Sequence, residues 1–298
     1  MKSTKILKAL GTVNTVDVIG EKPQAFTDMS SEMIKDCDCK WSVFNRDSLI
    51  SRINTTKDFV IADDETIRII KEADEYRKLS NGSFDIMTGG LNMMWKKALR
   101  EGRLPDEGLI IQAKRERSME IRENAIRVSG GSIDLGGIAK GFILDRLISE
   151  FRRSTNRSCL FNLGGTIYSS DPIEVSIRDP FTPANSAMPQ RNVMRVKIEN
   201  ECVITSGSYE QEKEIDGRRY SHIIDPVTGY PSDTKLKSIT LIGNRGSFLD
   251  AMATALFCMD LDSGIRLLEK KSAEAVYIFE NGNVFISEGL RNRVTMEV

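Results

Sequence analysis

The stretch from residue 158 to residue 242 most constrains the fold, because its sequence is mostly β. It contains the β-branched, apolar runs IEVSIRD, VMRVKIE, CVITSG and LKSITLIG. Parallel strands need a long, usually helical crossover after each strand, whereas antiparallel strands can be joined by short turns. The regular strand–helix–strand rhythm of a dinucleotide-binding sheet is missing, so we expect an α+β fold with largely antiparallel sheets.

Helices are expected on either side of this region. Residues 65–79 carry Ile67, Ile70 and Ala73 at helical spacing, and residues 138–153 show the same period. The sequence also predicts helices over 27–39, 91–100, 248–259 and 263–271, a strand pair or one long bent strand over 7–19, a hairpin over 118–128, and strands at the C-terminus.

One Pro-, Ser- and Asn-rich segment, residues 179–192, interrupts the β-rich region. Such a composition is typical of an exposed loop, and its place between strands argues against a domain linker. We therefore expect residues 1–298 to form a single domain.

The composition excludes several classes of function. A net charge of −1 removes the electrostatic argument for binding nucleic acid. No apolar run approaches the ~18 residues of a membrane-spanning helix. The five cysteines are odd in number and scattered, which argues against a disulfide framework and favours a reducing compartment. Cys37 and Cys39 lack a second cysteine pair that would complete a metal site, so we expect free thiols there.

The segment GGSIDLGGIAKGF, residues 130–142, is suited to an anion. Four glycines surround Asp134, and a helix is expected to begin at the second pair. Glycines at a helix start let backbone N–H groups approach a phosphate, and the helix dipole favours its charge. Lys140 would add a positive group. The segment has neither a Walker A nor a GxGxxG pattern, so a tight packing turn remains an equal alternative.

Asp250 and Thr254 form a second candidate pair within residues 246–260. Ser247 is the expected N-cap of a helix there, which would place Asp250 in the first turn. Residues four apart share one helix face, and a carboxylate beside a hydroxyl suits Mg²⁺, which takes few protein ligands alongside phosphate and water. The alternative is a capping Asp and a helix-facing Thr, which is the commoner role of such residues.

His222 is the only histidine of the chain. It follows a β run and precedes the turn DPVTGYP. A lone histidine is more often structural, but an imidazole near a phosphate-suited loop is also a useful general base. In segment 80–95 a Phe-Asp pair follows a turn and leads into two glycines, and the plain interpretation is a loop and helix start packed by Phe84 and Trp95. In segment 158–169 two adjacent glycines end an apolar strand and would let a ligand or another backbone segment approach.

Taken together, these segments resemble the ApbE family over nearly the whole chain. The resemblance rests on ALGT (9–12), FNRDSLISRIN (44–54), NGSFD (81–85), IDLGGIAKGF (133–142), FNLGG (161–165), VITSGSYE (203–210), YSHIIDPVTGYP (220–231) and DAMATALF (250–257). Members of that family are FAD:protein FMN transferases, and some are Mg²⁺-dependent FAD pyrophosphatases. The resemblance implies a T-fold-like α+β architecture with FAD in a cleft between two lobes.

The resemblance also implies roles for single residues. Asp250, Thr254 and the carbonyl of Gly137 would bind Mg²⁺. His222 would deprotonate a Ser or Thr hydroxyl of an acceptor protein, which attacks the FMN phosphorus and releases AMP. The residues implied in contacting FAD are Ser83, Phe84, Asp85, Asp134, Lys140, Ile224, the backbone near Leu10, and Phe44 or its neighbour Asn45 beside a ring of the flavin or adenine.

The partners implied are FAD and an acceptor protein, a redox subunit or reductase with a short motif around the modified Ser or Thr. Two alternatives remain open: water as the nucleophile, which gives a pyrophosphatase, and a protein that stores FAD without turnover. Many family members are exported lipoproteins, but no signal or acylated cysteine precedes the ALGT motif here. We therefore expect a cytoplasmic protein, the alternative being an exported or lipid-anchored one whose signal is not part of this chain.

Overall fold

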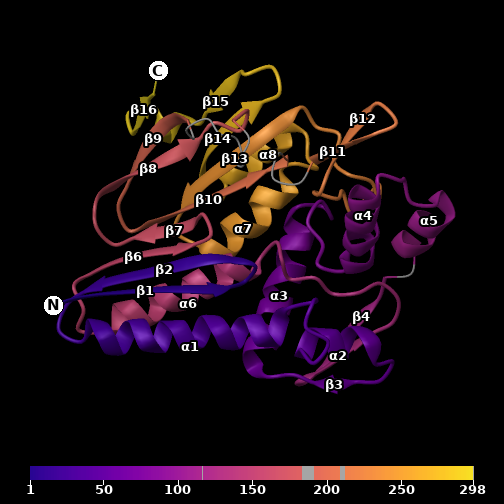
Figure 1. Ribbon diagram of the computed structural model, residues 1–298, viewed down its shortest axis with the longest axis horizontal. Helices are drawn as coiled ribbons and strands as arrows, with labels where there is room; N and C mark the ends of the chain where they lie inside the picture. The colour runs from indigo at the N-terminus through magenta and orange to yellow at the C-terminus, as the bar shows by residue number, and fades with distance from the viewer. Residues whose placement is uncertain (116, 183–190, 209–211, 298) are drawn as a thin grey trace.

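A single eight-stranded sheet forms the centre of the molecule in the computed structural model, which describes residues 1–115, 117–182, 191–208 and 212–297 (Figure 1). All pairings between the described strands are antiparallel, which confirms the predicted α+β fold. Most of the loop predicted over 179–192 lies outside the described residues. In their order across the sheet, the strands are β1 (Lys2–Ala9), β2 (Thr12–Ile19), β6 (Ser158–Leu163), β7 (Thr166–Ser169), β10 (Glu201–Gly207), β13 (Leu236–Gly243), β14 (Glu274–Phe279) and β15 (Val284–Ile286).

Three smaller sheets and a set of helices complete the fold. The small sheets are β3 (Val60–Ile61), β5 (Ala125–Val128) and β4 (Met119–Arg122); β11 (Glu212–Ile215) and β12 (Arg218–Ser221); and β16 (Val294–Met296), β9 (Asn192–Ile198) and β8 (Ile173–Arg178). The helices are α1 (Pro23–Trp41), α2 (Leu49–Thr55), α3 (Asp64–Leu79), α4 (Gly89–Glu101), α5 (Glu107–Arg115), α6 (Ala139–Arg153), α7 (Gly246–Ala255), α8 (Leu261–Glu269) and a short 3₁₀ helix (Glu288–Leu290).

The first two strands form a hairpin, which settles the choice between a strand pair and one bent strand. Leu10 and Gly11 make the two-residue turn, with φ of 56° and 70°. Two consecutive residues with positive φ match the turn type whose twist suits a tight hairpin. Part of the ALGT motif therefore forms the turn of this hairpin.

The main sheet is covered on both faces. Helices α1, α6 and α7 pack on one face, and the β8–β9–β16 sheet packs on the other (Figure 1). Strand β13 is buried along its whole length. Its Ile239 and Leu241 belong to the helix-side core, whereas Ile242 belongs to the core beneath the small sheet. Both faces of β13 are therefore covered, and its polar residues Lys237, Ser238 and Thr240 are buried along with its apolar ones.

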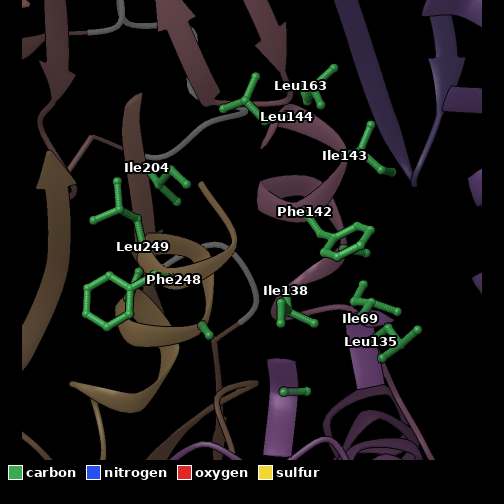
Figure 2. Close-up of a cluster of buried hydrophobic side chains, with 14 of the residues drawn as sticks. Ile69, Leu135, Ile138, Phe142, Ile143, Leu144, Leu163, Ile204, Phe248 and Leu249 are labelled. Carbon is green, nitrogen blue, oxygen red and sulfur yellow. The ribbon is translucent and has the colours of Figure 1, made fainter. Parts of the chain in front are cut away.

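Helices α6 and α7 approach each other very closely at two glycines. A side-chain carbon on Gly141 would lie 2.2 Å from the Gly246 carbonyl oxygen, and one on Gly246 would lie 2.6 Å from the Gly141 carbonyl oxygen. Figure 2 shows the apolar side chains around this crossing, among them Phe142 and Ile143 from α6 and Leu249 from α7. The close approach matters for function because it brings α7 against the glycine-rich start of α6.

The start of α7 differs from the prediction. The N-cap is Arg245, not Ser247, and the helix begins at Gly246, so Asp250 lies in the second turn. The cap comes from α6 instead: the carboxylate of Asp145 accepts hydrogen bonds from the backbone N–H groups of Gly246 at 2.6 Å and Ser247 at 2.9 Å. Burial raises the pKa of the Asp145 carboxyl, although both hydrogen bonds favour its charged form.

Replacing Asp145 by alanine is expected to destabilise the protein by about 2 kcal/mol, because two N–H groups at the start of α7 would lose their acceptor. Chemical denaturation measures the change. Asp260→Ala is the matched control, since Asp260 caps α8 at an exposed position with a single backbone bond and its loss should cost about 1 kcal/mol or less. Equal losses in both variants would contradict a special role for the inter-helix cap.

Most of the predicted helices are confirmed with small shifts at their ends. The sequence did not predict α2, α5 or the short 3₁₀ helix. The predicted 248–259 helix starts two residues earlier and stops at Ala255. No helix within the described ranges is both long and apolar enough to cross a membrane.

Candidate active site

A cavity of about 320 Å³ collects nearly all the residues selected from the sequence. Its volume lies within the usual range of small-molecule sites. The walls come from segments far apart in the chain: the loops before α4 and α6, the end of β10, α7, and the loop after β12. The predicted residues that line it are Phe44, Ser83, Phe84, Asp85, Asp134, Gly137, Lys140, His222, Ile224, Asp250 and Thr254.

Leu10 does not line the cavity. Its side chain packs against the main core from the β1–β2 turn. Thr12, at the end of that turn, lies where a side chain on Gly164 would be, and Gly164 itself lines the cavity. The turn therefore adjoins the cavity wall, and the contact of its backbone with FAD stays a prediction.

Asp250 lies at the glycine-rich start of α6. Its Oδ2 accepts a hydrogen bond from the backbone N–H of Gly141 at 2.9 Å, and its Oδ1 lies 3.9 Å from Lys140 Nζ. The carboxylate is almost fully buried, with 6% of the side chain exposed. A buried charge is stable only when it is paired and hydrogen-bonded, and both conditions are met here.

The surroundings of Asp250 supply oxygen donors of the kind that Mg²⁺ prefers. Thr254 lies one turn further along α7, with Oγ1 3.5 Å from the Asp250 carbonyl oxygen. A side chain on Gly137 would lie 3.3 Å from Thr254 Oγ1, so the backbone of Gly137 runs directly beside that hydroxyl. The described residues contain no group of three or more His, Cys, Asp or Glu suited to a metal. A cation here would have one charged protein ligand and would need further oxygens from water or phosphate.

Asp134 organises the loop before α6. Its two carboxylate oxygens accept hydrogen bonds from the Gly136 N–H at 2.9 Å and from Asn92 Nδ2 at 3.0 Å. The Asp134 N–H donates to the carbonyl of Ile86 at 2.8 Å, which ties this loop to the NGSFD segment. The glycine-rich segment packs tightly and also lines the cavity, and its binding of an anion stays a prediction.

Arg117 was not predicted, and it connects two walls of the cavity. Its Nη1 lies 3.0 Å from Asp85 Oδ2, and its Nη2 donates to the Pro226 carbonyl at 3.0 Å. Both charged side chains are largely buried, at 18% and 12% exposure. The guanidinium thus fixes the NGSFD segment relative to the loop that carries His222. Because the partners lie 32 and 109 residues away, no local sequence signal marks this residue.

Trp95 anchors the loop after His222 from α4. Its Nε1 donates to the Gly229 carbonyl at 2.8 Å, and its ring stacks on Tyr220 at 5.5 Å between centroids. Trp95 was expected to pack a helix start, and it is indeed buried, but its polar contact ties α4 to the His222 loop. His222 is half-buried and directly follows β12.

Two backbone contacts position Ile224, which lies two residues after His222. It pairs with Pro231 across the loop, and its carbonyl accepts a weak hydrogen bond from the Cys258 thiol at 3.9 Å. Burial raises the pKa of that thiol, so the thiol stays protonated and can act as the hydrogen-bond donor. The loop that presents His222 is therefore positioned on several sides before any ligand binds.

Replacing Arg117 by alanine is expected to lower both stability and activity. The loss should reach about 3 kcal/mol, because Asp85 would keep a largely buried charge without its partner. Arg117→Lys keeps the positive charge but loses the planar guanidinium, whose two nitrogens bind Asp85 and the Pro226 carbonyl at once. This variant should therefore regain more of the lost stability than of the lost activity. Denaturation measures the change in stability, and the rate of the FMN transfer that the family resemblance implies measures the change in activity. The control is Arg77→Ala, which breaks a more exposed ion pair with Asp74 and should lower stability by less than about 1 kcal/mol. An equal loss of stability in the two alanine variants would refute the bridging role of Arg117.

The fold and the cavity together define an α+β protein whose only histidine shares one polar site with a carboxylate, a lysine and a glycine-rich helix start. The model of the ApbE family matches residues 10–278, so the chain belongs to the ApbE family.

Curated relatives and solved structures agree with this assignment. A protein of Treponema pallidum (strain Nichols) named FAD:protein FMN transferase is 28% identical over 318 residues, covering 96% of this chain and 86% of the relative. One of Klebsiella pneumoniae (strain 342) with the same name is 29% identical over 234 residues, covering 76% and 72%. The crystal structure of the ApbE protein of Thermotoga maritima has a TM-score of 0.87 at 27% identity, covering 97% of this chain and 98% of that one. The flavin transferase ApbE from Vibrio cholerae, at 20% identity and a TM-score of 0.81 over 98% and 99%, shows the shared fold.

Proposed function

We propose that this protein is a Mg²⁺-dependent FAD:protein FMN transferase, which moves FMN from FAD to a Ser or Thr hydroxyl of an acceptor protein and releases AMP. One observation carries the proposal: His222, the Asp250–Thr254 pair and the glycine-rich start of α6 line the same cavity. The name shared by relatives that match 96% and 76% of this chain supports it independently.

In this proposal, each group of cavity residues has its own role. Ser83, Asp85 and Asp134 bind FAD, and Phe84 and Ile224 supply apolar walls. Lys140, close to the start of α6, faces the non-bridging phosphate oxygens and offsets the charge that builds up on them. His222 takes the proton of the acceptor hydroxyl, which is a weak nucleophile until a base removes that proton.

Mg²⁺ would be held by Asp250, Thr254 and the Gly137 carbonyl, and bound there it would neutralise charge on the pyrophosphate. The fit is good for a cation that also binds substrate, because these residues offer hard oxygens but only one negative charge. The hydrogen bond from Gly141 keeps one oxygen of Asp250 occupied, which leaves the other oxygen on the side of Lys140.

The deciding experiment is mass spectrometry of a flavin-accepting redox protein after incubation with this protein, FAD and Mg²⁺, beside a sample with chelator. A mass gain of one FMN that disappears with chelator is the expected result. Release of free FMN and AMP without any gain would replace the transferase by a pyrophosphatase. FAD that stays intact and bound would make the protein a flavin-storage protein.

A further inference from the structure

A second hollow, of about 660 Å³, opens beside the cavity between α4 and β11. We call it the α4–β11 groove. It shares Phe44, Met93 and Lys96 with the cavity, so the two adjoin. Whatever lies in the groove therefore lies at an entrance to the site that holds His222.

Exposed apolar side chains line the part of the groove next to the cavity. Phe44 is 70% exposed and Met93 is 59% exposed. Lys96 Nζ lies 4.5 Å above the Phe44 ring, which orients that ring without covering it from solvent. Adjacent exposed Phe and Met side chains rimmed by polar groups are typical of surfaces that bind another protein.

Most of the remaining lining is basic. Lys96, Lys97 and Arg100 come from α4, and Lys213 comes from β11. Among the described residues of the lining, Glu212 is the only carboxylate, and Lys237 already pairs with it at 2.6 Å. The groove therefore presents a net positive charge to solvent.

This charge has no sufficient explanation in the stability of the fold. The helix dipole favours cations at the end of a helix, which accounts for Arg100 and for Lys213 beside the Arg100 carbonyl, but not for Lys96 or Lys97. The ion pair between Arg100 and Glu101, at 3.4 Å, is exposed and contributes little. Lys213 Nζ donates to the Arg100 carbonyl at 3.2 Å, which holds β11 against α4 and fixes the cations relative to one another.

We propose that the α4–β11 groove docks the acceptor protein, and that it selects a segment with acidic side chains close to its Ser or Thr. The proposal rests on the transferase function, because a hydrolase has no use for an acceptor. The acidic side chains would contact Lys97, Arg100 and Lys213, while Phe44 and Met93 cover the apolar part of the segment. The acceptor hydroxyl would then enter the cavity across the wall that the two hollows share.

The test measures docking apart from catalysis. A short fluorescein-labelled peptide with one threonine flanked by aspartate and glutamate is titrated with the FAD-loaded protein, and fluorescence anisotropy gives its Kd. The triple variant Lys97→Glu/Arg100→Glu/Lys213→Glu should weaken binding at least about tenfold, and higher salt should weaken binding to the parent protein. These three residues line the groove but not the cavity, so the affinity for FAD should stay unchanged.

The matched control is Arg266→Glu/Lys270→Glu/Lys271→Glu, an equal charge change on exposed residues at and after the end of α8. Equal weakening by both triple variants, or equal binding of a peptide with asparagine and glutamine in place of the acidic residues, would overturn the docking surface. FMN transfer to a redox protein is followed separately with the same variants. If the peptide binds in a groove-dependent way but no FMN is transferred, the transferase function is rejected and the docking surface is kept. If the groove variant transfers FMN with an unchanged acceptor KM, only the docking surface is rejected.

Discussion

Replacing His222 by asparagine is expected to abolish FMN transfer while FAD remains bound. Asparagine is polar and fits the loop between β12 and the Asp225 turn, but it cannot accept a proton from a hydroxyl. The loss of a general base typically costs about 10²–10⁴-fold in rate. Transfer is measured by the flavin fluorescence of the acceptor protein, and FAD affinity by quenching of flavin fluorescence on binding.

The control for this substitution is Tyr220→Phe, two residues earlier on β12. It keeps the ring that stacks on Trp95, so it alters the same strand without touching the proposed base. Tyr220→Phe should transfer at close to the parental rate. A His222→Asn variant that also did so would remove His222 from the chemistry and leave it with a structural role in the loop.

The spacing of residues within single segments was enough to predict much of the fold. The apolar period of Ile67, Ile70 and Ala73 identified α3, and the same reasoning identified α6. A period needs several turns to be recognised, so α2, with seven residues, offered too little. The run LKSITLIG of β13 could be identified as a strand, but only the tertiary structure shows that both of its faces are buried.

The candidate site was predictable where a short motif carries the relevant chemistry. His222, Asp250 and the DLGGIAKG segment stand out by residue type, and the structure places them in one cavity. The residues that fix their geometry do not stand out. Trp95 reaches Gly229 across 134 residues, and Asp145 reaches Gly246 across 101, so neither leaves a pattern in the neighbouring sequence. The error at Ser247 has this cause, because a serine near a helix start is a normal cap unless another helix supplies one.

Replacing Asp250 by alanine is expected to reduce transfer by about a thousandfold and to remove its dependence on Mg²⁺. The variant loses the only carboxylate among the three predicted ligands, and it leaves Lys140 without the anion 3.9 Å away. The rate is measured across a Mg²⁺ titration. Mg²⁺-dependent thermal stabilisation of the FAD-bound protein gives a second readout that does not require turnover. An alanine variant with an unchanged Mg²⁺ midpoint would take Asp250 out of the metal site.

Asp250→Asn separates the metal-binding role of this residue from its structural role. The carboxylate accepts the Gly141 N–H at 2.9 Å, so alanine would also leave a buried donor without its acceptor and lower the melting temperature. Asparagine keeps an acceptor oxygen for that N–H but loses the charge that attracts a cation. If Asp250 is a ligand, the asparagine variant should fold almost as stably as the parent and still fail to respond to Mg²⁺. Thr254→Val should raise the Mg²⁺ midpoint by a smaller factor, because a neutral hydroxyl contributes less than a carboxylate. An asparagine variant with parental activity and Mg²⁺ response would show instead that Asp250 is needed only to hold the start of α6.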